Sequence, residues 1–532
     1  MRVLLIAPRF ARNLWTYERA LALIGRKSTL PPLGLITVAA LLPQDWEFRL
    51  VDRNVSEVAQ ADWAWAELIL LSGMTTQRED FLALVREAKQ RGKRVAVGGP
   101  YPTTLPGEVA AAGADYLALG EGELTIPAFV AALQQGEKEG CFSPNGEFAD
   151  LSHTVVPRFD LLDLRAYESM SVQFSRGCPF RCEFCEIGVL FGSRARAKTP
   201  AQMLAEFDRL RELGWRRSIF VVDDNFVGNR VKVRDLLREL KPWQRRHGYP
   251  FTLNTEASMD LASDRELLDL MADCNFNGVF LGIETPDDAS LKRAGKLQNT
   301  RLPLETAVET ITRAGLCVMG SFILGFDGEQ PGAGERICEF MERTSIPTTV
   351  VSMLQALPRT TLWERLKREG RLRGEDARLN LETLMNFEPT RPMDEIAREY
   401  SAALWQIYDP VRFLDRTYHH FQMLAPPRWD LKERTPDEHG WQDIRALLTL
   451  CWRQGIKRRS RWKFWQYLFR IGRNNPRVVG HYICTLAHLE HFLWIRKSVR
   501  HQVETQLGVH SLPQQAAPRK TSPRPDSPAP VI

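Results

Sequence analysis

The sequence predicts an α/β protein with a Rossmann-like doubly wound domain, then a partial (β/α)6 barrel, and finally a helical C-terminal domain. Two runs of short apolar segments, each followed by turn residues and a helix-length stretch, predict the two parallel sheets. From about residue 385 the apolar spacing becomes helical. We expect domains at 1–135, 171–384 and 385–510, a linker at 136–170, and a disordered tail at 511–532, where Pro and Ser are frequent.

The length and composition favour a multidomain globular protein. A chain of 532 residues can bury two or three full cores, and 44% hydrophobic with 26% charged residues is typical of such proteins. No apolar run approaches the roughly 20 residues of a spanning helix, and Met1–Pro8 is too short for a signal peptide. The nine cysteines are scattered apart from one cluster, which favours a reducing, cytoplasmic location over a disulfide framework.

The first domain is predicted from β-rich runs that alternate with helical patterns. The expected strands are Val3–Ala7, Phe48–Asp52, Leu68–Ser72, Val95–Gly98 and Tyr116–Leu119. In sheets of this type ligands bind outside the carboxyl ends of the strands. The candidate binding residues at these ends are Asp52, Asn54, Ser72, Met74, Gly98 and Gly99.

The barrel is predicted from a second, longer βα rhythm. Its expected strands are Ser171–Ser175, Ser218–Asp223, Phe251–Thr255, Gly278–Ile283, Val318–Leu324 and Thr349–Leu354. Helices are expected at Ala201–Leu213 and at Asp264–Ala272, with Ser263 as the N-cap of the second. Barrel chemistry lies at the carboxyl ends of the strands, so the acids that follow them are candidate ligand contacts: Asp224, Glu256 and Glu284.

Three cysteines follow the first barrel strand as Cys178-x3-Cys182-x2-Cys185, on a loop opened by Gly177 and Pro179. This spacing lets three thiolates converge on one metal centre and leaves one coordination position open. A structural zinc site would require a fourth ligand nearby. The next cysteine is Cys274, and no histidine lies between residues 153 and 247.

This motif resembles the signature of the radical S-adenosylmethionine (SAM) enzymes. The resemblance implies that Cys178, Cys182 and Cys185 hold a 4Fe–4S cluster whose fourth iron binds SAM. Reductive cleavage of SAM would then give a 5′-deoxyadenosyl radical. It also implies that Asp224, Glu256 and Glu284 contact SAM.

The first domain resembles the cobalamin-binding domain that precedes the barrel in one large radical SAM class. The class pattern of Asp-x-His, Ser-x-Leu and Gly-Gly is matched by Asp52-x-Asn54, Ser72-x-Met74 and Gly98-Gly99. Asn54 stands where the class has the cobalt-ligating histidine, so a histidine-ligated cobalt is not expected. The alternative for this domain is an empty or nucleotide-binding Rossmann fold.

The C-terminal region contains an unusual basic and aromatic segment. Residues 444–489 contain no Asp or Glu, whereas 451–480 contain nine Lys or Arg. Aromatic side chains are interleaved with them: Trp452, Trp462, Phe464, Trp465, Tyr467 and Phe469. Three interpretations remain open, namely packing on the barrel, contact with a membrane surface, and nucleic-acid binding as the least favoured.

The resemblance implies a cobalamin-dependent radical SAM C-methyltransferase that acts on a small molecule or a lipid such as a hopanoid. It would take electrons from a flavodoxin or ferredoxin and bind no nucleic acid. Alternatives are a radical cyclase or rearrangement enzyme on a tetrapyrrole or another metabolite, and a non-catalytic corrinoid- or metal-binding protein. A methylthiotransferase acting on transfer RNA would carry a second three-cysteine cluster, but no cysteine precedes Cys141.

Overall fold

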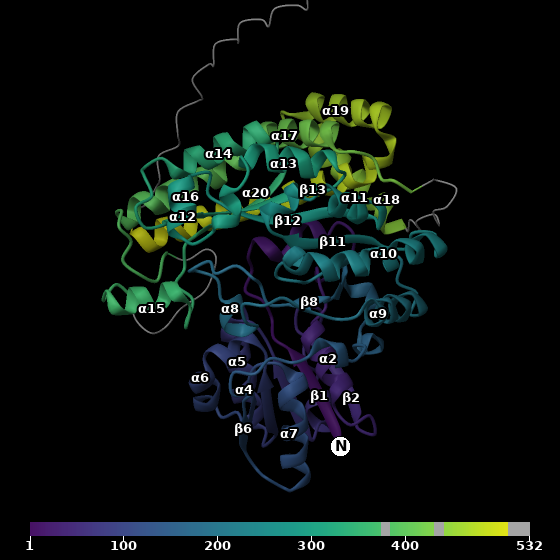
Figure 1. The fold of residues 1–532 in the computed structure, drawn as a ribbon, viewed down its shortest axis with the longest axis vertical. Helices are drawn as coiled ribbons and strands as arrows, with labels where there is room; N and C mark the ends of the chain where they lie inside the picture. The colour runs from purple at the N-terminus through teal and green to yellow at the C-terminus, as the bar shows by residue number, and fades with distance from the viewer. Residues whose placement is uncertain (374–383, 430–440, 509–532) are drawn as a thin grey trace, which may run out of the picture.

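A computed structural model describes residues 1–373, 384–429 and 441–508. The N-terminal sheet lies at one end of the molecule, and the barrel lies above it, covered by the C-terminal helices (Figure 1). The predicted disordered tail at 511–532 lies outside the described residues.

The first sheet is parallel throughout, with the strand order β2-β1-β3-β4-β5-β6 in the described chain. The strands are β1 (Arg2–Ala7), β2 (Glu47–Asp52), β3 (Leu68–Ser72), β4 (Arg94–Gly98), β5 (Tyr116–Ala118) and β6 (Gly140–Phe142). The order reverses between β1 and β3, and in open α/β sheets this switch point is where ligands bind. Strand β6 lies in the segment for which the sequence predicts a linker.

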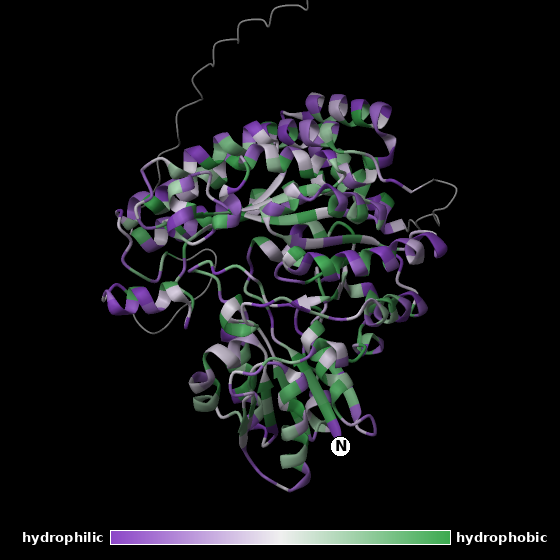
Figure 2. Ribbon diagram, viewed as in Figure 1, coloured by the Kyte–Doolittle hydropathy of each residue, from purple (hydrophilic) through white to green (hydrophobic). Residues whose placement is uncertain are grey.

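Helices cover both faces of this sheet, as a doubly wound fold requires. Alternate residues of β1 point to opposite faces: Val3 and Leu5 pack with α2 (Leu33–Leu41) and α7 (Gly122–Gln134). Leu4 and Ile6 pack with α3 (Gln60–Trp65) and α4 (Arg78–Gln90). The strands are therefore apolar on both sides, and Figure 2 shows them green along most of their length.

A second parallel sheet forms the barrel, in the strand order β14-β13-β12-β11-β10-β7 within the described residues. The strands are β7 (Met170–Val172), β10 (Ser218–Val221), β11 (Thr252–Ala257), β12 (Phe276–Glu284), β13 (Cys317–Leu324) and β14 (Thr348–Met353). Strands β7 and β14 lie at opposite edges of the sheet, so the barrel is open on one side, as predicted.

Helices α9 (Pro200–Glu212), α10 (Arg230–Arg246), α11 (Arg265–Asp273), α13 (Leu304–Arg313) and α14 (Ala333–Thr344) connect the barrel strands. The prediction that Ser263 caps α11 is wrong. The cap is Asp264, whose carboxylate accepts from the Leu267 N–H at 3.1 Å. Ser263 instead donates to the Asp260 carbonyl, since it lies in the preceding turn η7 (Met259–Ser263).

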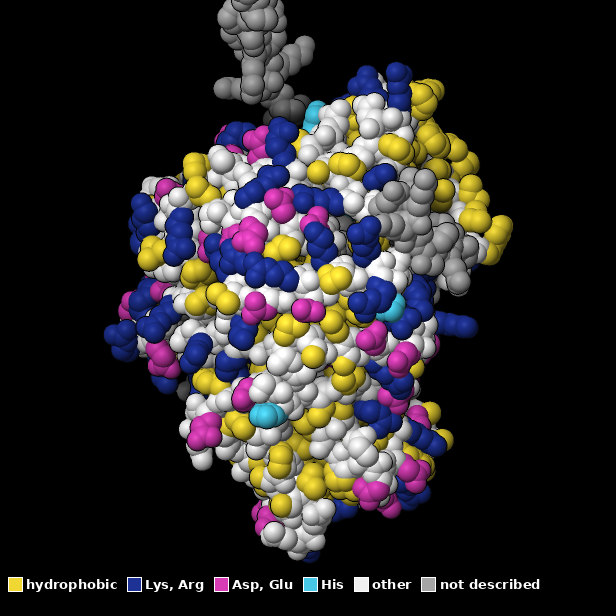
Figure 3. All heavy atoms as spheres, turned by 45° about the vertical axis from the view of Figure 1, so that its right-hand side comes forward, with side chains coloured by type: hydrophobic (Ala, Val, Ile, Leu, Met, Phe, Trp, Pro, Cys, Tyr) yellow, Lys and Arg dark blue, Asp and Glu magenta, His cyan; other side chains and the backbone are white. Residues whose placement is uncertain are grey.

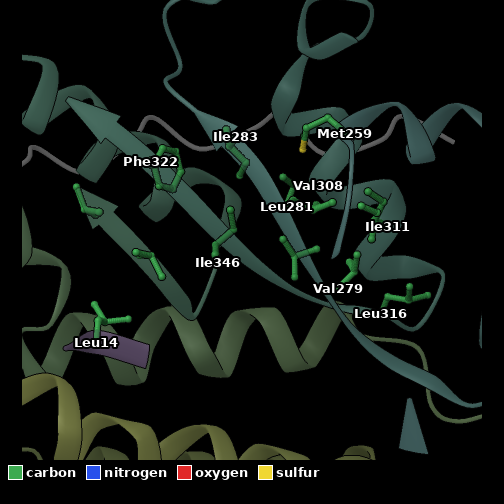
Figure 4. Close-up of a cluster of buried hydrophobic side chains, with 14 of the residues drawn as sticks. Leu14, Met259, Val279, Leu281, Ile283, Val308, Ile311, Leu316, Phe322 and Ile346 are labelled. Atoms are coloured by element: carbon green, nitrogen blue, oxygen red, sulfur yellow. The ribbon is translucent and has the colours of Figure 1, made fainter. Parts of the chain in front are cut away.

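The barrel core lies between its strands and these helices. Figure 4 shows Val279, Leu281 and Ile283 of β12 among buried side chains that include Val308 and Ile311 of α13. The other residues of β12 point to the opposite face of the strand, toward the barrel interior.

The C-terminal helices pack directly on the barrel. They are α16 (Met393–Ile407), α17 (Pro410–Met423), α18 (Trp441–Trp452), α19 (Arg461–Asn474) and α20 (Val479–Leu507). Helix α16 contacts α14 and β14, while α20 contacts α16 and the N-terminal helix α1 (Glu18–Leu21). Their buried side chains belong to the same hydrophobic cluster as those of the barrel. Over the described ranges, no helix combines the length and apolar content that crossing a bilayer requires.

Candidate functional site

The three cysteines lie on a tight loop between β8 (Ser175–Arg176) and α8 (Ile187–Leu190). Gly177 begins the loop with a φ of 87°, and a Cβ there would lie 2.6 Å from the Arg194 carbonyl oxygen. Only glycine fits both constraints. The loop closes on itself, since the Cys185 N–H donates to the Cys182 carbonyl at 3.2 Å.

The thiols share one partly buried environment. Burial raises the pKa of Cys185 to about 12 and also raises the pKa of Cys178, and the neighbouring Cys182 thiol adds to both shifts. Asn225 donates to the Cys178 sulfur at 3.7 Å, and Gln298 donates to the Cys182 sulfur at 3.6 Å. Ligating thiols must be deprotonated, and iron supplies the positive charge that reverses such shifts. Hydrogen bonds to sulfur are a known control on cluster potential.

Two acids stand at the carboxyl ends of β10 and β11, beside the thiols. Burial raises the pKa of Asp224 to about 6, and its Oδ2 is buried without a hydrogen-bond partner. Burial raises the pKa of Glu256 to about 8, with Asp224 adding to the shift. The Glu256 carboxyl has no hydrogen-bond or ion-pair partner among the described residues. The free Oδ2 of Asp224 and the unpartnered Glu256 carboxyl lie in a low-dielectric interior and suit a cationic ligand, and SAM carries a sulfonium and an ammonium.

Glu284 is the third predicted acid, and its carboxylate is already engaged. Its Oε1 pairs with Lys296 Nζ, and its Oε2 accepts from Ser321 Oγ at 3.0 Å. Burial alone would lower the pKa of Lys296, but Glu284 and the Cys182 thiol outweigh it and raise that pKa. Glu284 also has a φ of 67°, which is uncommon for a residue with a side chain. The pair places a cation next to the cysteine loop.

The predicted corrinoid residues of β3 and β4 lie together at the carboxyl ends of these two strands, next to the switch point between β1 and β3. A Cβ on Gly99, whose φ is 92°, would meet Ser72 Oγ at 2.5 Å and the Gly73 nitrogen at 3.2 Å. A Cβ on Gly98 would lie 3.1 Å from a carbonyl oxygen of β5. Met74 is 47% exposed beside them. The two glycines therefore let the ends of β3, β4 and β5 pack closely, and a side chain at either position would displace these strand ends.

Asp52 and Asn54 form a local hydrogen-bond network at the end of β2. Asn54 Nδ2 donates to Asp52 Oδ1 at 2.7 Å, and Asn54 Oδ1 accepts from the Phe10 N–H at 2.9 Å. Asp52 is buried and also accepts from Tyr167 Oη at 3.0 Å. Both groups of the Asn54 amide are thus occupied by partners within the protein.

Ion pairs join the two candidate cofactor sites. Arg176, which directly precedes the cysteine loop, pairs with Glu121 and Glu123 at 2.9 Å. These acids follow β5 of the first domain. Arg196 also pairs with Glu121 at 2.9 Å. The carboxyl ends of both sheets therefore face each other, and the thiols lie on the barrel side of that interface.

Sequence reasoning missed several of these contacts. Lys296 and Gln298 lie in the connection between β12 and α13, where no local motif marks them. Tyr167 lies in the predicted linker, and its partner Asp52 is 115 positions away. Arg176 stands beside the cysteine motif, but the sequence does not indicate which acids it pairs with.

Three family models match the chain and together define its class. Residues 20–130 match the B12 binding domain, residues 172–341 match the radical SAM superfamily, and residues 360–505 match a domain of unknown function (DUF4070). The fold and these matches define a radical SAM protein with an N-terminal B12-binding domain. They confirm the predicted cofactor set of a 4Fe–4S cluster, SAM and cobalamin, and exclude a purely structural zinc protein from consideration.

Two relatives extend the similarity over nearly the whole chain. An uncharacterized methyltransferase of Synechocystis sp. is 55% identical over 97% of this chain and 96% of its own. The hopanoid C-2 methylase of Rhodopseudomonas palustris is 34% identical over 88% of this chain and 89% of its own. The protein belongs to the cobalamin-dependent radical SAM methyltransferase family, as the sequence predicted.

Solved structures share the fold at low sequence identity. The radical SAM methyltransferase TsrM from Kitasatospora setae, with cobalamin and a 4Fe–4S cluster bound, has a TM-score of 0.60 at 16% identity. The alignment covers 94% of this chain and 99% of TsrM. The cobalamin-dependent enzyme OxsB, with aqua-cobalamin and SAM bound, has a TM-score of 0.58 at 16% identity, over 95% of this chain and 80% of OxsB. The predicted fold class is confirmed.

Proposed function

We propose that the protein transfers a methyl group to an unactivated carbon of a polycyclic isoprenoid lipid of the hopanoid class. The observation that carries the proposal is the ion-paired junction at Arg176, because it sets the cysteine loop against the glycine-rich strand ends of the first domain. A methyl donor on one side and a radical generator on the other would then act on one substrate carbon held between them.

In this proposal Cys178, Cys182 and Cys185 bind the cluster, and Asp224 and Glu256 face the positive groups of SAM. The corrinoid lies over Ser72, Met74, Gly98 and Gly99, with Asp52 and Asn54 holding the neighbouring strand end. When bound, the cluster supplies the electron that cleaves SAM, and cobalamin supplies the methyl group. A flavodoxin or ferredoxin would reduce the cluster.

Partly exposed apolar side chains on the inner face of the barrel strands, beside the Glu284–Lys296 pair, support a lipid substrate. Phe280 is half-buried and lies on the same strand face as Gly282 and Glu284. These two residues lie next to Lys296. Trp15 packs edge-on against Phe280 at a centroid distance of 5.0 Å and is 36% exposed. Met319 of β13 shares its strand face with Ser321. The similarity to a hopanoid methylase covers 88% of this chain and favours the same substrate class.

A lipid substrate would be met at a membrane, so the proposal places the protein in the cytoplasm with a peripheral contact to the bilayer. The test is anaerobic reconstitution with iron, sulfide and hydroxocobalamin, followed by incubation with SAM, a reductant and a detergent-solubilised hopanoid. We expect 5′-deoxyadenosine, S-adenosylhomocysteine and a product heavier by one CH2.

The test variant is Cys182→Ala, and Cys141→Ala is its control. Cys141 is exposed on β6 and lies far from the motif in sequence. The first variant should lose iron and 5′-deoxyadenosine, while the second should keep both. A product of unchanged carbon number, with 5′-deoxyadenosine but no S-adenosylhomocysteine, would instead support the cyclase alternative.

A further inference from the structure

The C-terminal helices expose an unusual share of the large apolar side chains. Of the eighteen that are exposed in the described chain, nine fall within residues 441–469. They are Trp441, Ile444, Leu447, Leu448, Trp452, Ile456, Trp462, Trp465 and Phe469, here called the aromatic surface. Figure 3 shows hydrophobic side chains gathered along the upper right of the molecule, where Figure 1 places α18 and α19.

The spacing of these residues puts them on one face of each helix. In α18, Trp441, Ile444 and Leu448 recur at three- and four-residue intervals, and in α19, Trp462, Trp465 and Phe469 do the same. Such a stripe usually faces a protein core. Here it faces outward, with Trp462 74% exposed and Phe469 71% exposed.

The opposite faces of these helices are the ones that anchor them. Leu450, Phe464 and Ile471 are buried in the main hydrophobic cluster. Trp465 Nε1 donates to the Gly455 carbonyl at 2.9 Å, and a Cβ on Gly455 would lie 2.8 Å from the Trp465 ring. The bend η9 (Arg453–Lys457) between the helices is therefore fixed, and each helix buries one apolar face while presenting another.

Cations surround the aromatic surface. The exposed cations that form no ion pair with an acid among the described residues include five here called its cations: Lys457, Arg459, Arg461, Arg470 and Arg473. Lys457 lies over the Trp452 ring at 5.5 Å, and Arg461 lies over the Trp462 ring at 5.6 Å. Three neighbouring cations do pair with acids of α17 and α20, Lys463 with Asp415 and both Arg453 and Arg458 with Glu490, whereas residues 444–489 themselves contain no Asp or Glu.

We propose that the aromatic surface and its five cations dock on the surface of an anionic lipid bilayer. Trp and Phe side chains enter the boundary between headgroups and acyl chains, while Lys and Arg attract anionic headgroups. A second copy of this chain is a poorer partner, because a two-fold contact would place this positive surface against itself. The sequence left packing and membrane contact open, and exposure of both aromatic faces favours the membrane.

The membrane contact rests on the proposed function, because it names the surface through which the protein would reach a lipid substrate. The observations behind it are separate from the cofactor sites. Vesicle binding needs no turnover, so it is measured on the Cys182→Ala protein as well as on the wild type. Failure of vesicle binding would leave methyl transfer to a solubilised substrate possible, and failure of methyl transfer would leave vesicle binding intact.

The experiment is co-flotation of the full chain with vesicles of phosphatidylcholine mixed with phosphatidylglycerol, and with vesicles of phosphatidylcholine alone. We expect binding to the anionic vesicles that weakens with salt, and much weaker binding to the neutral ones. The double variant Trp462→Ser/Phe469→Ser should reduce partitioning at least about tenfold. The triple variant Arg459→Gln/Arg461→Gln/Arg470→Gln should reduce it about a hundredfold on anionic vesicles only.

The matched control is Val231→Ser/Val411→Ser, because these side chains are 67% and 39% exposed outside the aromatic surface. It should bind like the wild type. All substituted side chains are exposed, and circular dichroism confirms that each variant is folded. No flotation of the wild type, or equal flotation of the Trp462→Ser/Phe469→Ser variant, would overturn the proposal. A wild-type dimer that this variant dissociates, without vesicle binding, would show a self-interface instead.

Discussion

The Arg176 guanidinium binds the Glu123 carboxylate through two hydrogen bonds of 2.9 Å, joining the cysteine loop of the barrel to the first domain. Both side chains are largely buried, at 11% and 12% exposure, and Glu121 accepts from the same guanidinium. A planar bidentate pair fixes orientation as well as distance. The relative position of the two candidate cofactor sites depends on this contact.

Arg176→Ala should therefore destabilise the folded protein strongly. Two buried carboxylates would lose a charged partner, which costs about 3 to 5 kcal/mol of unfolding free energy. Arg2→Ala is the control, since its pair with Glu67 is exposed and the substitution should change the stability little. Urea unfolding of each variant measures the difference. Adding Glu123→Ala to Arg176→Ala should recover part of the loss, and equal effects of the two arginine variants would contradict this role.

Asp224→Asn and Glu256→Gln should weaken SAM binding. Each replaces a buried, ionisable carboxyl that would face a positive group of SAM with a neutral amide, and a hydrogen bond to a charged group contributes about 1.5 to 3 kcal/mol, or roughly tenfold to a hundredfold in affinity. Equilibrium dialysis with SAM measures the effect on the reconstituted protein. Asp288→Asn, on the exposed start of α12 (Asp288–Arg293), should bind like the wild type. Unchanged affinity in both test variants would remove these residues from the proposed SAM site.

Gly99→Ala should abolish cobalamin retention. The substitution places a Cβ against Ser72 and the Gly73 backbone, at a φ of 92° that costs about 1 to 2 kcal/mol for a residue with a side chain. Gly107→Ala on α6 (Pro106–Ala111) is the control, because its Cβ would meet nothing within 4 Å. Corrinoid absorbance after gel filtration distinguishes the two. Full retention by Gly99→Ala would argue against a corrinoid close to this turn.

Stability should fall as the pH drops below about 6.5. Burial lowers the pKa of His420 to about 3 and of His491 to about 4, so the folded protein keeps both neutral while the unfolded chain protonates them. The unfolded state then binds more protons, and its relative stability increases between pH 6.5 and 4. The expected loss is roughly 1.4 kcal/mol for each histidine at pH 5.5 relative to pH 7.5.

Urea unfolding at the two pH values tests this expectation. His420 Nε2 accepts from the Val318 N–H at 3.4 Å, and His420→Gln offers an acceptor that does not titrate. This variant should lose part of the pH dependence, whereas His153→Gln should not, because His153 is exposed. An identical pH dependence in all three proteins would contradict the assignment to His420.

The sequence alone determined the fold class and the cysteine motif, because these depend on local spacing, and the resemblance of its motifs to a known family implied the cofactor set. Apolar periodicity distinguishes strand from helix, and Cys178, Cys182 and Cys185 lie within eight consecutive residues. The same locality placed Ser72, Gly98 and Gly99 at strand ends, since parallel strands end at one edge of a sheet. Local pattern gave the wrong N-cap for α11, because Ser263 belongs to the preceding turn and the cap is the next residue, Asp264.

Only the tertiary structure decided which distant charges and surfaces meet. Lys296 lies over the Phe184 ring of the cysteine loop and pairs with Glu284, Arg176 pairs with Glu123, and Tyr167 donates to Asp52. No local pattern encodes these contacts. The sequence also could not predict that Trp462 faces outward, because an amphipathic helix has an apolar stripe whether that stripe faces a core or the outside. In each case the physical reason is that long-range packing, rather than local propensity, sets the partner of a side chain.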